Sequence, residues 1–185
     1  MKALTLIVLV TLPFYSTGQG VFTNQTHTTL QKVISDYPYQ FKHIKGETIN
    51  EDPQSTDFAS SVAIPGALNT VITKYSSSDD RQVLSWKCVL AETDDFDVVS
   101  KKYRELYDQI KNSIIRMDDD RSFILNGSYE LPAEEKQFNV SSLQLLPPTG
   151  DLSKLKVEIT LEFLITEWKL TLLVYDQQEE KIVME

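Results

Sequence analysis

Residues 154–175 read KLKVEITLEFLITEWKLTLLVY, and this stretch decides the fold. Apolar side chains take every second position of residues 154–164 and again of residues 168–175, with polar residues between most of them. The apolar positions are Leu155, Val157, Ile159, Leu161 and Phe163, then Trp168, Leu170, Leu172 and Val174. Such alternation is typical of antiparallel strands that have one buried side and one solvent-facing side. Because only residues 165–167 separate the two runs, we expect them to form a hairpin at the centre of the core.

A helix is predicted over residues 94–115, where apolar residues recur at spacings of three and four. Its apolar positions are Phe96, Val99, Tyr103, Leu106, Tyr107, Ile110 and Ile114. Either Thr93 or Asp94 is expected to cap the first turn by accepting a backbone hydrogen bond. The opposite face carries lysine, arginine and aspartate, so we expect the apolar face to pack on one apolar row of the hairpin.

The other patterned segments add a second helix and five strands. The helix covers residues 26–44 and is expected to kink or end near Pro38. The strands cover residues 58–64, 68–75, 81–92, 122–131 and 137–146, whereas the polar residues 47–56 are predicted to form a loop. The order α-β-β-β-α-β-β-β-β indicates an α+β fold. We expect a twisted antiparallel sheet of about six or seven strands with both helices packed on one face, and we find no internal repeat.

Residues 1–18 have the composition of a secretion signal. Lys2 supplies a positive charge, a short apolar run follows, and Ser16 and Gly18 place small residues at positions −3 and −1 of a cleavage site. The apolar run is shorter than the roughly 20 residues that a membrane-spanning helix needs. We therefore predict a secreted or periplasmic protein, cleaved after Gly18, with one soluble α+β domain over residues 19–185 and no transmembrane segment after signal removal.

The charge and the cysteine content limit the classes of partner and of stabilising bond. Removal of Lys2 with the signal leaves 17 basic and 27 acidic residues, a formal charge of −10. Because an acidic surface repels phosphate backbones, a nucleic-acid partner is not expected. Cys88 is the single cysteine, so the chain forms no internal disulfide and must be held together by packing.

The sequence does not decide between a bacterial periplasm or cell surface and a eukaryotic secretory route. A domain without disulfides suits a bacterial periplasm or cell surface at least as well as an animal secretory route. However, N-x-S/T triplets begin at Asn24, Asn126 and Asn139, and these would be glycan acceptors in a eukaryotic secretory pathway. The sequence alone does not decide whether they carry glycans.

No catalytic residue, cofactor site or metal site is predicted. Cys88 shares the apolar side of its strand with Trp86, which favours an inert buried thiol over a nucleophile. His27 and His43 are the only histidines, and they lack the spacing of a zinc site. Both lie at the ends of the first predicted helix, where an ordinary surface role suffices.

The acidic residues likewise form no recognisable site. Residues 118–120 are all aspartate, but Phe123 stands where a calcium-binding loop would need glycine, so a solvated turn is favoured. Glu158 and Glu162 lie on the polar side of one strand, where a glycosidase-type pair cannot be distinguished from a soluble surface.

Three aromatic residues are the remaining candidates for a site. Tyr37, Tyr39 and Phe41 surround Pro38 in a partly polar segment and could line a binding groove, because aromatic residues are enriched at interfaces. The leading hypothesis is a non-enzymatic periplasmic or cell-surface protein that binds a protein, a peptide or a small apolar ligand. The alternative is a secreted hydrolase-type enzyme whose site is assembled from dispersed acidic and hydroxyl residues. The partner and the oligomeric state are not specified by the sequence.

Overall fold

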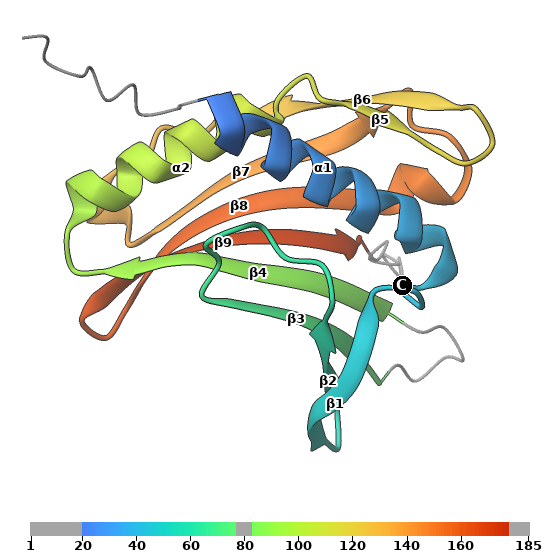
Figure 1. Ribbon diagram of the computed structural model, residues 1–185. Helices are drawn as coiled ribbons and strands as arrows, with labels where there is room; N and C mark the ends of the chain where they lie inside the picture. The colour runs from blue at the N-terminus through green and yellow to red at the C-terminus, as the bar shows by residue number, and fades with distance from the viewer. Residues whose placement is uncertain (1–19, 77–82, 178–185) are drawn as a thin grey trace, which may run out of the picture.

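The computed structural model describes residues 20–76 and 83–177, and the predicted signal of residues 1–18 lies outside this part of the chain. The described residues form two α-helices, three short 3-10 helices and nine strands (Figure 1). The first half contains α1 (Gly20–Asp36), η1 (Tyr37–Tyr39), β1 (Lys45–Asp52), β2 (Ser55–Ser60), β3 (Asn69–Tyr75) and β4 (Val83–Thr93). The second half contains α2 (Phe96–Ile110), β5 (Ile114–Arg116), β6 (Ser122–Ser128), η2 (Glu134–Lys136), β7 (Phe138–Leu146), η3 (Gly150–Lys154), β8 (Leu155–Leu164) and β9 (Glu167–Asp176).

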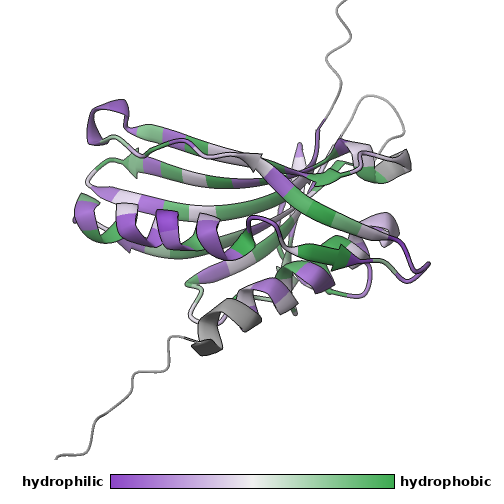
Figure 2. Ribbon diagram, turned by 90° about the horizontal axis from the view of Figure 1, so that it is seen from above, coloured by the Kyte–Doolittle hydropathy of each residue, from purple (hydrophilic) through white to green (hydrophobic). Residues whose placement is uncertain are grey.

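The strands form one antiparallel sheet in the order β1-β2-β3-β4-β9-β8-β7-β6-β5. Both helices lie on the same side of this sheet, and the β1–β2 hairpin extends beyond the layer that the helices cover (Figure 1). Apolar and polar residues alternate along the central strands, as Figure 2 shows. The predicted α+β class, with two helices and a large antiparallel sheet, is therefore confirmed.

The β8–β9 hairpin forms the centre of the core, as its alternation predicts. Ile159 pairs with Leu172 and Leu161 pairs with Leu170, and all four side chains are buried. Helix α2 packs on β8, β9 and β4 through its own buried face, which includes Leu106. Among the described residues, the opposite side of the sheet carries no helix and bears polar residues such as Glu158, which are only partly buried.

The prediction of six or seven strands is wrong because two strands carry no readable alternation. Residues 47–56, predicted as a loop, contain most of β1 and the start of β2, which pair across residues 52–55. All but the first residue of β1 are exposed on both sides, so no buried side imposes a period of two. Strand β5 has three residues, and the first two of them fall inside the range predicted as helix. The observed order is therefore α-β-β-β-β-α-β-β-β-β-β.

The first helix starts and ends earlier than the predicted range of residues 26–44. It is followed by the 3-10 turn that contains Pro38 and by a tight turn in which Gln40 and Phe41 adopt φ angles of 57° and 55°. The Asp36 carboxylate stabilises this turn because it accepts hydrogen bonds from the backbone N–H groups of His43 (3.0 Å) and Ile44 (3.2 Å). Pro38 therefore ends the helix rather than kinking it.

Helix α2 is shorter than predicted and is capped one residue later. Asp95 is the N-cap, and its Oδ1 accepts a hydrogen bond of 3.0 Å from the Val98 N–H. Thr93 and Asp94, the predicted caps, precede this position. Ile110 ends the helix, and Ile114 lies instead on the exposed side of β5 with its side chain half exposed.

Helix α1 closes one edge of the sheet. Gln31 Nε2 donates to the Arg116 carbonyl oxygen at 2.5 Å, and Gln31 Oε1 accepts from the Arg116 N–H at 2.9 Å. His27 Nε2 lies 3.0 Å from the Ile114 carbonyl oxygen. These side chains form hydrogen bonds with the outward-facing backbone groups of β5. Another strand therefore cannot pair with this edge of the sheet through those groups.

Replacement of Ile159 by alanine should lower the free energy of unfolding by about 2–5 kcal/mol, because it leaves a cavity under α2. Arg104→Ala, on the exposed side of α2, is the matched control and should change stability by less than about 0.5 kcal/mol. Denaturant unfolding followed by circular dichroism measures both. Equal midpoints for the two variants would mean that the wrong side of β8 has been assigned to the core.

Candidate functional site

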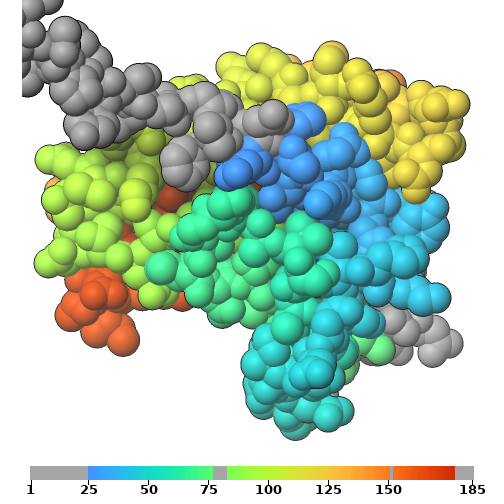
Figure 3. Space-filling model, in the orientation of Figure 1, coloured from blue at the N-terminus to red at the C-terminus, as the bar shows by residue number. Residues whose placement is uncertain are grey.

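The first candidate site is a cleft of about 620 Å³ between α2 and the β2–β3 connection, residues 61–68. We call it the α2 cleft. Figure 3 shows it as a hollow between the yellow-green surface of α2 and the green connection, with the red surface of β9 at its base. Its wall and floor come from segments far apart in the sequence, so no local sequence motif predicts the cleft.

The floor of the α2 cleft is apolar because of an irregularity in β4. The β4–β9 register shifts between Val89 and Ala91, which leaves Leu90 as the extra residue of a β-bulge. Leu90 lines the cleft together with Leu170 from β9 and Leu106 from α2. The bulge therefore adds an apolar side chain to the floor at the point where regular pairing stops.

A tight turn forms the wall opposite α2. Pro65 and Gly66 occupy its two central positions, Gly66 has a φ of +82°, and the Ala67 N–H donates to the Ile64 carbonyl oxygen at 3.0 Å. This is the sequence pattern of a type II turn, in which the third residue requires a positive φ. The Leu68 N–H donates to the Val89 carbonyl oxygen at 2.8 Å, which ties the turn to the bulged strand.

The rim of the α2 cleft is polar and carries both charges. Thr26 of α1 donates a hydrogen bond of 3.0 Å to Gln109 Oε1 of α2, which joins the two helices at one end of the cleft. Lys102 and Glu105 contribute a cation and a carboxylate from the exposed side of α2. An apolar floor below a polar rim is the usual construction of a small-molecule site.

A second cleft, of about 250 Å³, lies beside η1, and we call it the η1 cleft. Tyr37, Pro38, Gln40, Phe41, Leu84, Lys154 and Asp176 line it. Two of the three residues predicted to form a groove are thus brought together here, with Phe41 buried at the base and Tyr37 half buried. Tyr39 lies outside the lining and packs edge-on against His43, with ring centroids 5.3 Å apart.

The Asp176 carboxylate distinguishes the η1 cleft from an ordinary surface depression. Its Oδ1 atom is buried and has no hydrogen-bond partner among the residues that the structure describes. Sequence reasoning missed this residue, because an aspartate at the end of a strand looks like the start of the charged tail. Its position opposite Leu155 in the β8–β9 ladder places it on the helix side of the sheet.

Cys88, His27 and His43 do not come together in one site. The Cys88 side chain is fully buried, accepts a hydrogen bond from the Thr70 hydroxyl at 3.4 Å, and has its pKa raised by burial. His27 lies at the β5 edge, whereas His43 pairs with Asp36. The geometry assigns the thiol a packing role, since a nucleophilic cysteine needs a nearby base.

The acidic candidates are dispersed over the surface. Residues 118–120 are exposed, and Asp119 pairs with Arg121 at 2.6 Å. Glu158 accepts a hydrogen bond of 2.8 Å from Ser142, and burial together with Glu158 raises the pKa of Tyr175 to about 12. Within the described ranges, no group of three or more His, Cys, Asp or Glu side chains is arranged to hold a metal ion.

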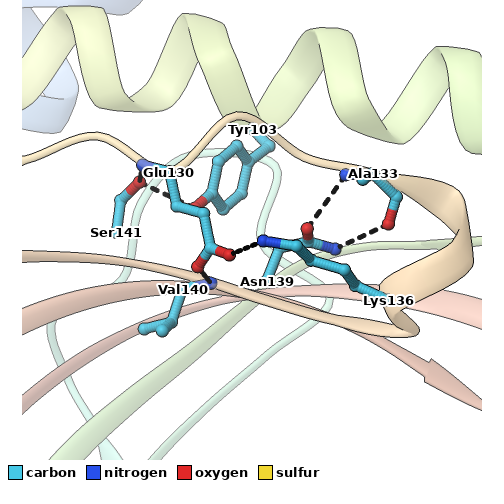
Figure 4. A network of polar contacts seen from close by, with 7 residues as sticks. All are labelled: Tyr103, Glu130, Ala133, Lys136, Asn139, Val140 and Ser141. Carbon is cyan, nitrogen blue, oxygen red and sulfur yellow. Dashed lines mark hydrogen bonds and ion pairs between the residues drawn. The ribbon is translucent and has the colours of Figure 1, made fainter.

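A partly buried polar network under α2 holds the segment between β6 and β7 in place (Figure 4). The hydroxyls of Tyr103 and Ser141 lie 2.7 Å apart, and Ser141 Oγ also accepts a hydrogen bond of 2.9 Å from the Glu130 N–H. Glu130 accepts from Lys136 and from the Val140 N–H, and these two donors hold the pKa of Glu130 below its usual range. Burial raises the pKa of Tyr103 to about 12.

Asn139 completes this network and cannot carry a glycan in the folded protein. Its side chain is 0% exposed, its Oδ1 accepts from the Ala133 N–H at 2.9 Å, and its Nδ2 donates to the Ala133 carbonyl oxygen at 3.3 Å. Asn126 is partly exposed and its Oδ1 accepts from the Gly127 N–H, while Asn24 lies on α1. The three triplets are therefore not equivalent.

No protein-family model, curated protein or solved structure matches this chain. Within the part of the chain that the structure describes, neither helix has the length and apolar character needed to cross a bilayer.

Tyr103→Phe should lower the free energy of unfolding by about 1–3 kcal/mol, because it removes a buried hydrogen bond to Ser141. Tyr39→Phe, at a half-exposed ring, is the matched control and should stay within about 0.5 kcal/mol of the wild type. Because the folded-state pKa of Tyr103 is raised, its contribution is present below pH 10 and is lost as the pH rises through about 12. Urea unfolding at neutral and alkaline pH checks both points, and an unchanged Tyr103→Phe midpoint would contradict them.

Proposed function

We propose that this protein is an exported, non-enzymatic binding protein of the periplasm or cell surface, and that it holds a small apolar ligand in the α2 cleft. The observation that supports this proposal most directly is the bulge at Leu90, which adds an apolar side chain to the floor of a cleft of about 620 Å³. Clefts of this volume, with apolar walls and a few polar groups, are the usual sites of small-molecule binding.

The neighbouring core favours a ligand site over a packing defect. Leu106 and Leu170 touch the cleft on one side but belong on the other to the continuous hydrophobic core, where they are almost completely buried. Protein interiors are normally packed without voids, so a cleft bounded by core residues is a place where an apolar molecule can complete the packing. A ligand with a polar end would direct that end toward Lys102, Glu105 and the Thr26–Gln109 pair at the rim.

The hydrolase alternative has no comparable support in this cleft. Hydrolysis by a side-chain nucleophile requires a hydroxyl or thiol within reach of a base that is itself oriented by a third group. The Thr26 hydroxyl donates instead to the Gln109 side-chain amide oxygen, which is not a base. The binding hypothesis is therefore the better supported of the two.

Export is supported by the composition of residues 1–18, and Asn139 favours a periplasm over a eukaryotic secretory route. Asn139 and Ser141 form an acceptor triplet, yet both side chains are fully buried in the folded protein. In a pathway that glycosylates chains as they enter, a glycan at Asn139 would prevent the Tyr103–Ser141 network from closing. A compartment without this modification avoids the conflict.

Mass spectrometry of the exported protein should find a chain that begins at Gln19 and carries no glycan at Asn139. Cleavage after Gly18 follows from the small residues at the predicted site. Gly18→Arg, which removes the small residue before the cut, should leave the signal attached, whereas Thr11→Ser, at a distance from the cut, should not affect processing. An exported wild-type chain that still begins at Met1 would remove the basis of the localisation.

Binding at the α2 cleft can be tested with N-phenyl-1-naphthylamine, an uncharged apolar probe whose fluorescence rises in apolar surroundings. The wild-type protein should bind it saturably, and Leu90→Gln should weaken binding by about tenfold or more, which corresponds to roughly 1.4 kcal/mol. Leu131→Gln, at an exposed leucine outside the cleft, should bind as the wild type does.

The same measurements define the outcome that would overturn the proposal. Circular dichroism melting curves of both variants should match the wild type, because Leu90 is only partly buried and Leu131 is exposed. Folded Leu90→Gln protein that binds the probe with wild-type affinity would show that the ligand site is elsewhere. Absence of saturable binding to the wild type would contradict a role in binding apolar ligands.

A further inference from the structure

We infer that the η1 cleft is a second binding site, separate from the α2 cleft, and that it takes a small zwitterion with an apolar side chain, the chemistry of a free α-amino acid. In this arrangement Asp176 receives the ammonium group of the ligand, Lys154 receives its carboxylate, and Tyr37 and Phe41 contact its side chain. Three independent features of the cleft lead to this ligand class.

The first feature is the unsatisfied oxygen of Asp176. A buried carboxylate oxygen without a donor costs free energy, since it has lost its hydrogen bonds to water and gained none from the protein. Asp176 Oδ1 is in this condition among the described residues, and the partly exposed Asp176 side chain lines a cleft open to solvent. A charged N–H donor from outside the protein would satisfy it with a strong, charge-assisted hydrogen bond.

The second feature is a cation that lies on the same cleft and forms no ion pair with Asp176. Lys154 precedes β8, and its carbonyl oxygen accepts a hydrogen bond of 2.9 Å from the Gln177 N–H, which holds the start of β8 beside the end of β9. None of the ion pairs among the described residues joins Lys154 to Asp176. A simple amine would meet repulsion from Lys154, whereas a zwitterion matches both charges.

The third feature is an apolar base that is held in place before any ligand arrives. Phe41 and Leu84 are buried beneath the cleft, and the Tyr37 ring meets Phe41 edge-on at a centroid distance of 6.0 Å. The positive φ angles of Gln40 and Phe41 are unfavourable for residues with side chains, and the Asp36 hydrogen bonds maintain them. A preformed site loses less conformational entropy on binding.

The size of the cleft limits the ligand to a single small molecule. At about 250 Å³ it is less than half as large as the α2 cleft. The two clefts share no lining residue, so binding at one can be measured while the other is altered. The ligand class inferred here does not depend on the apolar ligand proposed for the α2 cleft.

Isothermal titration calorimetry with three related probes tests the inference. L-leucine should bind, whereas N-acetyl-L-leucine, which lacks the ammonium group, and L-leucinamide, which lacks the carboxylate, should each bind about tenfold more weakly or worse. Asp176→Asn should reduce L-leucine affinity by a similar factor without lowering the melting temperature, because the amide keeps the size and shape of the partly buried carboxylate. Asp118→Asn, at an exposed aspartate outside both clefts, should bind as the wild type does.

Lys154→Gln provides an independent variant at the exposed rim, where loss of folding is not expected. It should weaken L-leucine binding but not L-leucinamide binding, since L-leucinamide has no carboxylate to lose a partner and its ammonium group is no longer repelled by Lys154. Equal affinities for L-leucine and L-leucinamide, wild-type affinity in Asp176→Asn, or no binding of L-leucine would each overturn the inference. Binding of N-phenyl-1-naphthylamine should be unaffected by either variant, so a failure here is distinguishable from a failure at the α2 cleft.

Discussion

The pairing of β4 with β9 is the interaction on which the rest of the structure depends. It joins the meander β1–β4, which follows α1, to the meander β5–β9, which follows α2, in one continuous sheet. Trp86 pairs with Val174 and Cys88 with Leu172 across this junction, and all four side chains are buried. Helix α2 packs over the junction, so the halves share one core. Each helix is thus followed by a meander, of four strands after α1 and of five strands after α2, although the sequence shows no repeat.

The parts of the fold that could be predicted from the sequence are those whose burial is one-sided. Strands β8 and β9 and helix α2 each bury one side, and their periodicity follows from that fact. Strand β1 has no buried side, and β5 is too short to show a period. The pairing of β4 with β9 could not be predicted from the sequence, because the two strands are far apart in the chain and either could have paired with another strand.

The candidate sites were predicted less well, for a related reason. Tyr37 and Phe41 were identified because an aromatic cluster around a proline is a local feature, yet their neighbour Tyr39 lies outside the cleft. The α2 cleft depends on a bulge, a type II turn and two helices that meet only in the folded protein. Asp176 acquires its importance from the burial of one oxygen atom, which no pattern of residue types records.

The positions of both clefts follow from the width of the sheet. Nine strands at about 4.8 Å spacing span nearly 40 Å, whereas two helices of roughly 10 Å diameter cover about half of that width. The remaining helix side must be covered by irregular segments, and residues 37–44, 61–68 and 129–137 pack against the core there. Irregular segments cover the face of a sheet less evenly than a helix does. The seams between these segments and the helices are therefore where concave, partly apolar surface arises, and both clefts lie on such seams.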